Sequence, residues 1–328
     1  MASQTEENED LDRLLKEKFT NDFRKGYVTV QGVCLPITYK RFEEEIENFE
    51  VKDDDVWVCS FPKSGTTWTQ EMIWCIGNNV DLEEAKKTLL IDRFPFLELT
   101  VLFDYENVTK LHPDRKLTLR TSNSVAYTRN MPSPRFIKCH LPFHLLPRQI
   151  RTGEKKPKIV YVTRNPKDTC VSYYYHSRLM EDYRGNFDEF CRLFLGHKLN
   201  YTPYWDHVVG FWTRRNAMSN ILCIKYEDMK ADLAAVIRKA AAFLNKPVPE
   251  DKMEMLVKHL SFDSMKTNWS VNYEEQIAGM QKLNTITADG KFIRKGQVNQ
   301  WKEEMPPSVI KKFDEMTKEK YAPHNLSF

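Results

Sequence analysis

The sequence predicts an α/β fold in which a single domain holds a central parallel sheet flanked by helices. Short apolar runs with the character of strands alternate with segments of helical spacing, and this alternation is typical of a parallel sheet covered on both faces. The chain has 328 residues, a length at which α/β proteins often form one domain. We therefore expect one domain over residues 1–328, with a phosphate-binding loop similar to a P-loop at the end of one strand.

The expected elements follow one another as strand, then helix. The first buried strand is 56–61, and residues with helical spacing follow it at 67–76. Ligands of parallel sheets bind beyond the carboxyl ends of the strands, so the residues after each strand are the candidates for a site. Further strands are expected at 135–141, 158–163 and 221–226, and further helices from about residue 166 and at 204–217, 233–244, 250–260 and 307–320.

Two segments stand outside this alternation. Residues 1–25 are polar and charged, and we expect them to form an N-terminal extension that adds little to the core. Residues 103–134 are weakly patterned, and we expect an inserted loop there. Loops of this length are usually functional lids or disordered.

Composition limits the kinds of partner. The 49 Lys and Arg against 46 Asp and Glu leave a net charge of +3, too balanced for a protein that coats nucleic acid, so an anionic ligand must be held by local clusters. The seven cysteines include no C-x-x-C pair, which favours a reducing compartment. The acidic start and the lack of an apolar stretch of about 20 residues predict a cytoplasmic protein without a membrane partner.

The segment Phe61–Trp68, with the sequence FPKSGTTW, connects the first strand to the first helix. Backbone N–H groups and the positive end of a helix dipole converge in such a turn, and Gly65 lets the backbone approach a ligand closely. The lysine precedes the glycine, whereas a P-loop NTPase carries it after the last glycine, so a nucleotide kinase or NTPase is the weaker alternative. The loop predicts a phosphate site with a cation from Lys63 and hydroxyl donors from Ser64, Thr66 and Thr67.

A second motif, Lys138-Cys139-His140-Leu141-Pro142, ends the strand at 135–141. Pro142 keeps the residue before it extended, and strand alternation places Lys138 and His140 on one face. A neutral imidazole can accept the proton of a hydroxyl near neutral pH, so His140 is a candidate general base. A lone histidine at a strand end is more often structural, so the residue type alone does not decide its role.

Cationic residues recur at two further places. Arg164–Asp168 follows the strand at 158–163, and its Pro166 suits the first turn of a helix that carries Ser172. Arg294-Lys295-Gly296 places two cations beside a glycine, which suits a dianionic phosphate. Taken singly, the first segment fits a helix cap and the second a solvated turn.

In this order the motifs resemble those of the cytosolic sulfotransferases, which take a sulfuryl group from PAPS, 3′-phosphoadenosine 5′-phosphosulfate, and release PAP. The resemblance spans about residues 25–320. It implies catalytic roles for His140 as general base and for Lys63, Lys138 and Ser172, without a metal. It implies that residues 63–67 bind the 5′-phosphosulfate, that Arg164, Ser172, Arg294, Lys295 and Gly296 bind the 3′-phosphate, and that adenine is held by Trp68, Tyr226 and Phe262 beside Ser261.

Two departures from the family pattern have consequences. Leu260-Ser261-Phe262 stands where the family commonly has Thr-Ser-Phe, so one hydroxyl contact to the nucleotide is lost. The family's dimer segment, K-x-x-x-T-V-x-x-x-E, becomes KEEMPPSVIK at 302–311. Proline removes a backbone donor, so we expect a monomer or a dimer through another surface.

The resemblance leaves the acceptor open. It implies a small hydrophobic acceptor such as a phenol, alcohol, steroid or retinoid-like molecule. A dehydratase that sulfates an allylic alcohol and then eliminates sulfate, as one relative does with retinol, is an alternative. A non-catalytic PAPS- or PAP-binding protein is another, although the presence of Lys63 and His140 disfavours it. The expected acceptor contacts are Phe96, Tyr39, Lys138, His140, Phe143 and Tyr175.

Overall fold

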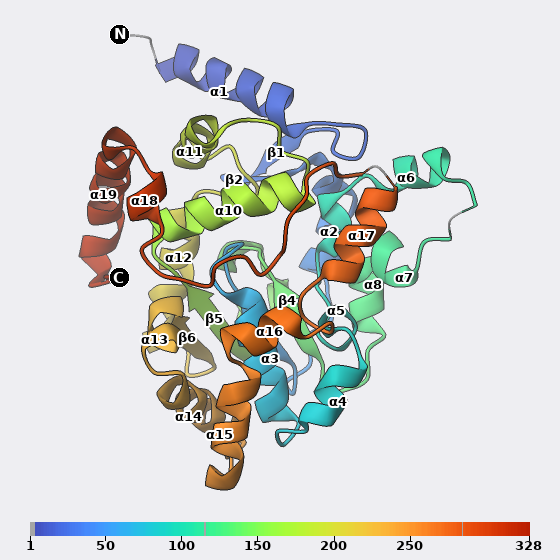
Figure 1. The fold of residues 1–328 in the computed structure, drawn as a ribbon, viewed down its shortest axis with the longest axis vertical. Coiled ribbons are helices and arrows are strands. Elements are labelled where there is room, and N and C mark those ends of the chain that lie inside the picture. The colour runs from blue at the N-terminus through green and yellow to red at the C-terminus, as the bar shows by residue number, and fades with distance from the viewer. Residues whose placement is uncertain (1–3, 115, 284) are drawn as a thin grey trace.

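The computed structural model describes residues 4–114, 116–283 and 285–328. Its centre is a four-stranded parallel sheet with the strand order β4-β3-β5-β6, which confirms the expected fold class (Figure 1). β3 lies inside the sheet, where Val56 is in register with Phe136 on one side and Lys158 on the other. The strands are β3 (Val56–Cys59), β4 (Phe136–Cys139), β5 (Lys158–Thr163) and β6 (Ile221–Lys225).

Alternate residues of the strands belong to two different hydrophobic clusters, one on each face of the sheet. Trp57 and Tyr161 belong to the first cluster, while Val58 and Val160 belong to the second. This is the two-fold periodicity of a strand buried on both sides. The first face is covered by α10 (Pro166–Met180), α11 (Phe187–Leu195), α12 (Tyr204–Trp212) and α19 (Pro307–Tyr321), and the second by α3 (Thr66–Gly77), α14 (Leu233–Leu244) and α15 (Glu250–His259).

The sheet order explains why the candidate motifs can meet. Each motif follows the carboxyl end of a different strand: the phosphate loop follows β3, His140 follows β4, Arg164 follows β5 and Tyr226 follows β6. Since the four strands are parallel, these ends lie along one edge of the sheet.

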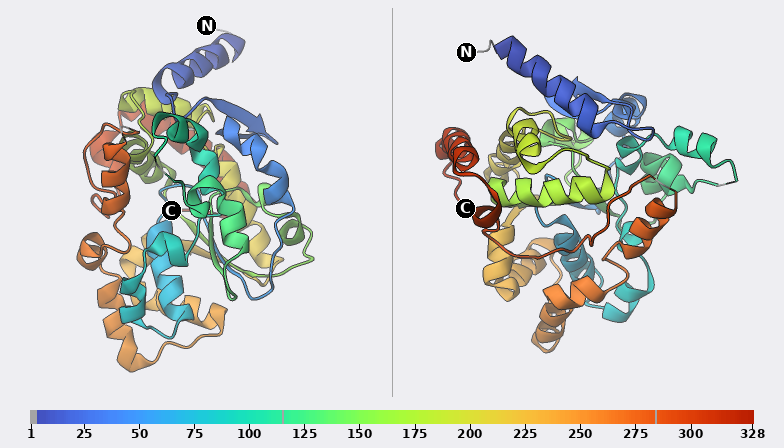
Figure 2. Two further views of the ribbon diagram at one scale, coloured as in Figure 1. Left: turned by 90° about the vertical axis from the view of Figure 1, so that its right-hand side faces the viewer. Right: turned by 45° about the horizontal axis from the view of Figure 1, so that its top comes forward.

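The N-terminal segment is part of the core, contrary to the expected polar extension; residues 1–3 of that extension lie outside the described residues. Helix α1 (Gln4–Phe19) packs against α11, and the pair is visible in both views of Figure 2. Its Leu11, Leu15 and Phe19 are buried in the first cluster. Charged residues fill the other face of this amphipathic helix and conceal the apolar stripe in the composition.

The segment 103–134 is largely helical rather than a loop; its Arg115 lies outside the described residues. The segment contains α6 (Tyr105–Leu111), α7 (Leu119–Ser122) and α8 (Ser124–Arg129). Ser124 anchors it to the sheet side of the molecule, because its backbone N–H donates to the Thr100 hydroxyl at 2.7 Å and its own hydroxyl donates to the Leu97 carbonyl at 2.7 Å.

The remaining elements surround this core. None of the described helices has both the length and the apolar character needed to cross a membrane. These remaining elements are the hairpin of β1 (Tyr27–Val30) and β2 (Val33–Pro36), and the helices α2 (Glu43–Glu47), α4 (Leu82–Lys87), α5 (Leu90–Arg93), α9 (Arg148–Arg151), α13 (Tyr226–Ala231), α16 (Phe262–Thr267), α17 (Glu274–Lys282) and α18 (Trp301–Glu304).

Candidate active site

The phosphate loop joins β3 to α3 and is shaped around Gly65. This glycine has φ +104°, and a Cβ built on it would lie 2.7 Å from Cδ2 of Tyr226. Only glycine fits both the backbone angle and the space. The neighbouring Ser64 hydroxyl is buried and lacks a hydrogen-bond partner among the described residues. The loop therefore presents an unpaired donor beside the N-terminal end of α3, which favours an anion.

Lys63 points from this loop into an environment that is apolar and positively charged. Its ammonium nitrogen lies 3.9 Å from the ring centroid of Phe292. Burial, together with the nearby cations Lys138 and Arg164, lowers the pKa of Lys63 to about 7. An anion bound at the loop would reverse this effect, because an opposite charge favours the protonated amine.

The tautomer of His140 is fixed by the hydrogen bond that its Nδ1 makes. Nδ1 lies 2.7 Å from the carbonyl oxygen of Ser60, and since a carbonyl can only accept, the ring proton is on Nδ1. Nε2 is then left with a lone pair. Burial and the charge of Lys138 lower the pKa of His140 well below its usual value, so the ring is neutral at neutral pH. A neutral imidazole held in this way is suited to accept a proton.

Two residues that the sequence did not indicate hold His140 in place. Its carbonyl oxygen accepts a hydrogen bond from Nε2 of His207 at 2.8 Å, and its backbone N–H donates to the Glu98 carboxyl at 2.5 Å. Glu98 comes from the segment that runs beside β4, where Phe96 forms a bridge with Lys138. Burial raises the pKa of Glu98 to about 7. The sequence feature that could have indicated Glu98 is its position directly after the apolar run Pro95-Phe96-Leu97.

Lys138 is a second buried amine in the same cavity. Its nitrogen lies 4.2 Å from the ring centroid of Phe96. Burial lowers the pKa of Lys138 to about 8, although the Glu98 carboxyl opposes this effect. The ammonium groups of both lysines are therefore stronger acids than usual, and their charge responds to a bound anion.

The other end of the cavity is built from aromatic rings and a second tight glycine. The edge of Trp68 meets Tyr226 at 5.6 Å between ring centroids, and Trp68 donates from Nε1 to the Leu260 carbonyl at 2.8 Å. The guanidinium of Arg164 lies 4.4 Å from the ring centroid of Tyr226. A Cβ on Gly296 would lie only 2.3 Å from Phe262. Aromatic faces beside a guanidinium suit a base and its phosphate.

The loop that carries Arg294 and Lys295 is tied to α10. The Asp168 carboxylate accepts hydrogen bonds from the backbone N–H groups of Asn299 at 2.7 Å and Trp301 at 3.3 Å. This loop is thereby fastened to the helix that begins after β5. Arg294 and Lys295 line the same cavity as Arg164.

One cavity of about 610 Å³ joins these features. Its wall also contains apolar residues from α6 and α17, and the ends of these two helices are linked by a 3.3 Å hydrogen bond between His112 and the Leu283 carbonyl (Figure 1). The site residues predicted from the sequence that line it are Lys63, Gly65, Thr66, Thr67, Trp68, Phe96, Lys138, His140, Arg164, Ser172, Tyr226, Phe262, Arg294, Lys295 and Gly296.

Comparison with known proteins identifies the family of this chain. The model of the family described as the sulfotransferase domain matches residues 53–324. The chain belongs to the sulfotransferase family. The family predicted from the motifs is thus confirmed, and the chain is an enzyme of the PAPS-dependent sulfotransferase class.

The similarity to known relatives and solved structures covers almost the whole of this sulfotransferase chain. Luciferin sulfotransferase of Photinus pyralis is 42% identical over 319 residues, which cover 97% of this chain and 85% of that protein. Sulfotransferase 1 family member D1 of Rattus norvegicus is 35% identical, with 93% and 96% covered. A crystal structure of retinol dehydratase in complex with androsterone and the inactive cofactor PAP superposes with a TM-score of 0.87 at 28% identity, covering 98% of this chain and 96% of that one.

Five of the predicted site residues do not line the main cavity of this sulfotransferase. Tyr39 is buried elsewhere, and Phe143 packs edge-on against Phe211 at 5.6 Å between centroids. The Ser261 hydroxyl is used within α16, where it donates to the Ser264 hydroxyl at 2.9 Å. Tyr175 lies under the Arg294 guanidinium at 4.0 Å and lines a smaller neighbouring pocket. Ser64, as noted, is buried within its loop.

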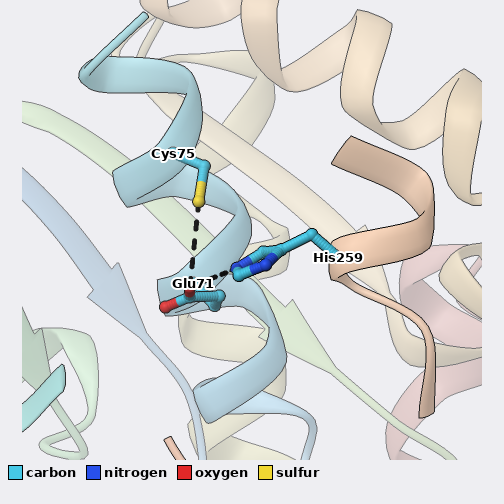
Figure 3. Close-up of side chains that lie close together, drawn as sticks. All are labelled: Glu71, Cys75 and His259. Atoms are coloured by element: carbon cyan, nitrogen blue, oxygen red, sulfur yellow. Dashed lines mark hydrogen bonds and ion pairs between the residues drawn. The ribbon is translucent and has the colours of Figure 1, made fainter. Parts of the chain in front are cut away.

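A buried cluster of Glu71, Cys75 and His259 lies between α3 and the end of α15 (Figure 3). Nε2 of His259 lies 2.7 Å from one carboxylate oxygen of Glu71, and Arg93 donates to the other oxygen at 2.5 Å. These three types of side chain could ligate a metal, but both oxygens are already paired, and burial raises the pKa of the Cys75 thiol well above its usual value. We interpret the cluster as an ion-pair network that joins α3 to the end of α15.

Proposed function

We propose that this sulfotransferase moves the sulfuryl group of PAPS to a hydroxyl of a small apolar acceptor and releases PAP. The observation that carries the proposal is the neutral His140, held with its proton on Nδ1, in the same cavity as Lys63 and the phosphate loop. A general base and a cation for the departing phosphate face one space. This is the requirement of direct group transfer between two oxygens.

The residues of the site fit the proposed donor. The Ser64 hydroxyl and Nε of Arg164 are buried and unpartnered among the described residues, so both are free to donate to phosphate oxygens. Gly65 and Gly296 leave room for close backbone approach. Under this proposal residues 63–67 hold the 5′ group, Arg164, Ser172 and 294–296 hold the 3′-phosphate, and Trp68, Tyr226 and Phe262 surround the adenine.

The roles of the side chains follow from their positions. PAPS supplies the sulfuryl group when it is bound. His140 takes the proton of the acceptor hydroxyl on Nε2 as the oxygen forms its bond to sulfur, while the bond from sulfur to the phosphate oxygen breaks. Lys63 neutralises the charge left on that oxygen, and losing such a preorganised cation costs about 10²–10³ in rate. Lys138 faces the same space and orients the acceptor oxygen, while Ser172 engages Lys63 and the nucleotide.

The acceptor region of the cavity is mainly apolar. Leu99, Leu102, Phe103, Val108 and Met280 line it together with Phe96. An apolar wall around a general base supports a hydrophobic phenol or alcohol as the acceptor.

A dehydratase that eliminates sulfate after transfer is the second candidate. It is favoured by the structural likeness to retinol dehydratase at a TM-score of 0.87. Incubation with an allylic alcohol and labelled PAPS separates the two: a stable sulfate ester supports the transferase, whereas an anhydro product with free sulfate supports the dehydratase.

We also propose that the protein is cytoplasmic and does not use the family's dimer segment. All seven cysteines are buried free thiols, as expected in a reducing compartment. Pro307 opens α19, and Lys311 pairs with Glu315 on its own helix at 3.9 Å. The Lys311 ammonium thus has a partner on its own helix.

The test is a sulfation assay with labelled PAPS against phenols, sterols, retinoids and amines. His140→Ala should abolish turnover while PAP affinity stays within a few-fold. His144→Ala is the matched control, because His144 is exposed and does not line the cavity. Activity largely retained in His140→Ala would refute the assignment of the base.

A further inference from the structure

A second histidine, His176, faces the acceptor region of the cavity. It lies on α10 one turn beyond Ser172 and lines the cavity wall. Its ring is surrounded by aromatic side chains, with Phe292 edge-on at 5.7 Å and Tyr173 at 6.3 Å between centroids. Its Nδ1 is buried and lacks a hydrogen-bond partner among the described residues. A phenylalanine would pack equally well here without leaving a polar atom unpaired.

The charge state of His176 limits what it can bind. Burial, with the charges of Lys63 and Lys138, lowers its pKa well below the usual value, so the imidazole is neutral at neutral pH. A neutral imidazole does not bind phosphate as a cation. It can accept a hydrogen bond at one nitrogen and donate one at the other.

A second unpaired polar group lines the cavity from a neighbouring helix. Oε1 of Gln276, on α17, is buried without a partner among the described residues, and its side chain contributes to the cavity wall. Helices α10 and α17 are joined by a small hydrophobic cluster that includes Leu179 and Ile277, with Phe292 packed against it. Two adjoining walls therefore each carry a hydrogen-bonding group that no described residue satisfies. We call His176 and Gln276 the polar subsite.

We propose that the acceptor carries a second polar group, a hydroxyl or an N–H remote from the oxygen that is sulfated, which hydrogen-bonds to the polar subsite while the reacting hydroxyl meets His140. This inference rests on the proposed function and narrows its substrate class. The preferred acceptor is an apolar phenol or alcohol with two polar ends. An acceptor with one polar end leaves the subsite unpaired and binds more weakly.

The test compares two series of phenols under steady-state conditions. One series carries a 4-alkyl chain, and the other ends the same chain in a primary carboxamide, which supplies N–H groups but is not itself a sulfation site. At the chain length that reaches the subsite, the amide should lower KM about tenfold relative to the plain chain, the factor that 1.4 kcal/mol represents. His176→Phe should abolish this preference while kcat for the plain series stays within a few-fold.

Variants at His176 and His197 control for structural effects. His176→Asn and His176→Gln keep a hydrogen-bonding atom near Nδ1 and Nε2 respectively, so at least one of them should retain the preference. His197 also has a buried Nδ1 without a partner in the described part of the chain, but it does not line the cavity, and its φ of +61° is tolerated by Asn. His197→Asn should leave the preference intact.

Each outcome has one meaning. Sulfation of neither series would contradict the proposed function itself. Sulfation of both series without a preference for the amide, or a preference that survives His176→Phe, would overturn the polar subsite alone. A fall in kcat for both series in His176→Phe would also overturn it, because it would mean that His176 acts on the reaction rather than on the remote group.

Discussion

The ion pair between Glu71 and Arg93 should be among the most costly to break in this protein. The Glu71 side chain is 0% exposed and the Arg93 side chain 7% exposed. Glu71→Gln keeps the size of the side chain but removes the charge, which leaves the guanidinium buried without a counter-ion. Removing one partner of a buried pair costs about 3–5 kcal/mol, whereas an exposed pair contributes about 0–1 kcal/mol.

The expected change in melting temperature follows from the size of the chain. An unfolding entropy of about 2.1 cal/mol/K per residue gives ~0.7 kcal/mol/K for 328 residues. The loss of about 3–5 kcal/mol therefore corresponds to a fall in Tm of roughly 4–7 °C. Glu84→Gln is the matched control, since Glu84 pairs with Lys87 at 2.8 Å on the surface, and it should shift Tm by about 1 °C or less.

The pH dependence of Tm gives a second test of the Glu71→Gln variant. Burial raises the pKa of Glu71, but the hydrogen bond from His259 and the charge of Arg93 outweigh it and hold this pKa below the usual value. The contribution of Glu71 is thus present above the pKa of an unfolded glutamate and is lost as pH falls through the folded pKa. The difference in Tm between wild type and Glu71→Gln should shrink in acid.

Thermal unfolding followed by tryptophan fluorescence, with and without PAP, measures these effects. Glu71→Gln should also weaken PAP binding, because His259 precedes Leu260, whose carbonyl holds the Trp68 indole. A Tm shift no larger than that of Glu84→Gln would refute the reasoning. A rise of several degrees when zinc is added to the wild type would show that the cluster is a metal site.

Three further predictions concern the nucleotide end and the assembly. Gly296→Ala should weaken PAP binding about tenfold or more, because its Cβ would meet Phe262 at 2.3 Å; unchanged affinity by calorimetry would show that the ring moves freely. Lys63 has a pKa of about 7 without nucleotide, so PAP binding at pH 8 should take up a proton in calorimetry across buffers of different ionisation enthalpy. Lys63→Met should reduce that uptake to the part that Lys138, with a pKa of about 8, can supply, and uptake that persists in full would assign the proton elsewhere. Sedimentation at micromolar concentration should give one chain mass of 38.8 kDa, and a stable dimer that dissociates on mutation within 302–311 would contradict the proposal that this segment does not form a dimer.

The parts of the site that the sequence predicted are those set by local structure. The strand-to-helix turn at 61–68 and the ends of β4 and β5 are each contained in a short segment, so pattern and turn chemistry indicate them. His176 and Gln276 acquire their roles only when separate segments meet, and nothing in their local sequence shows this; for Glu98 the local sequence offers only its place after an apolar run. Helix α1 was missed for a related reason: its apolar residues are few, and the cluster that buries them is formed by distant parts of the chain.

The two ends of the cavity differ in how freely they can change. Under the proposed function, the phosphate loop, His140, Arg164 and Tyr226 lie at the ends of four paired strands, so altering one of them disturbs the sheet or the tightly fitted Gly65. The wall around the proposed acceptor is supplied in part by α6 and α17, which lie outside the sheet and meet through the hydrogen bond of His112 to the Leu283 carbonyl. Substitutions in these helices can reshape the space for the acceptor while the transfer chemistry is preserved. Such a division allows one catalytic apparatus to be adapted to new small molecules by exchanging short peripheral segments.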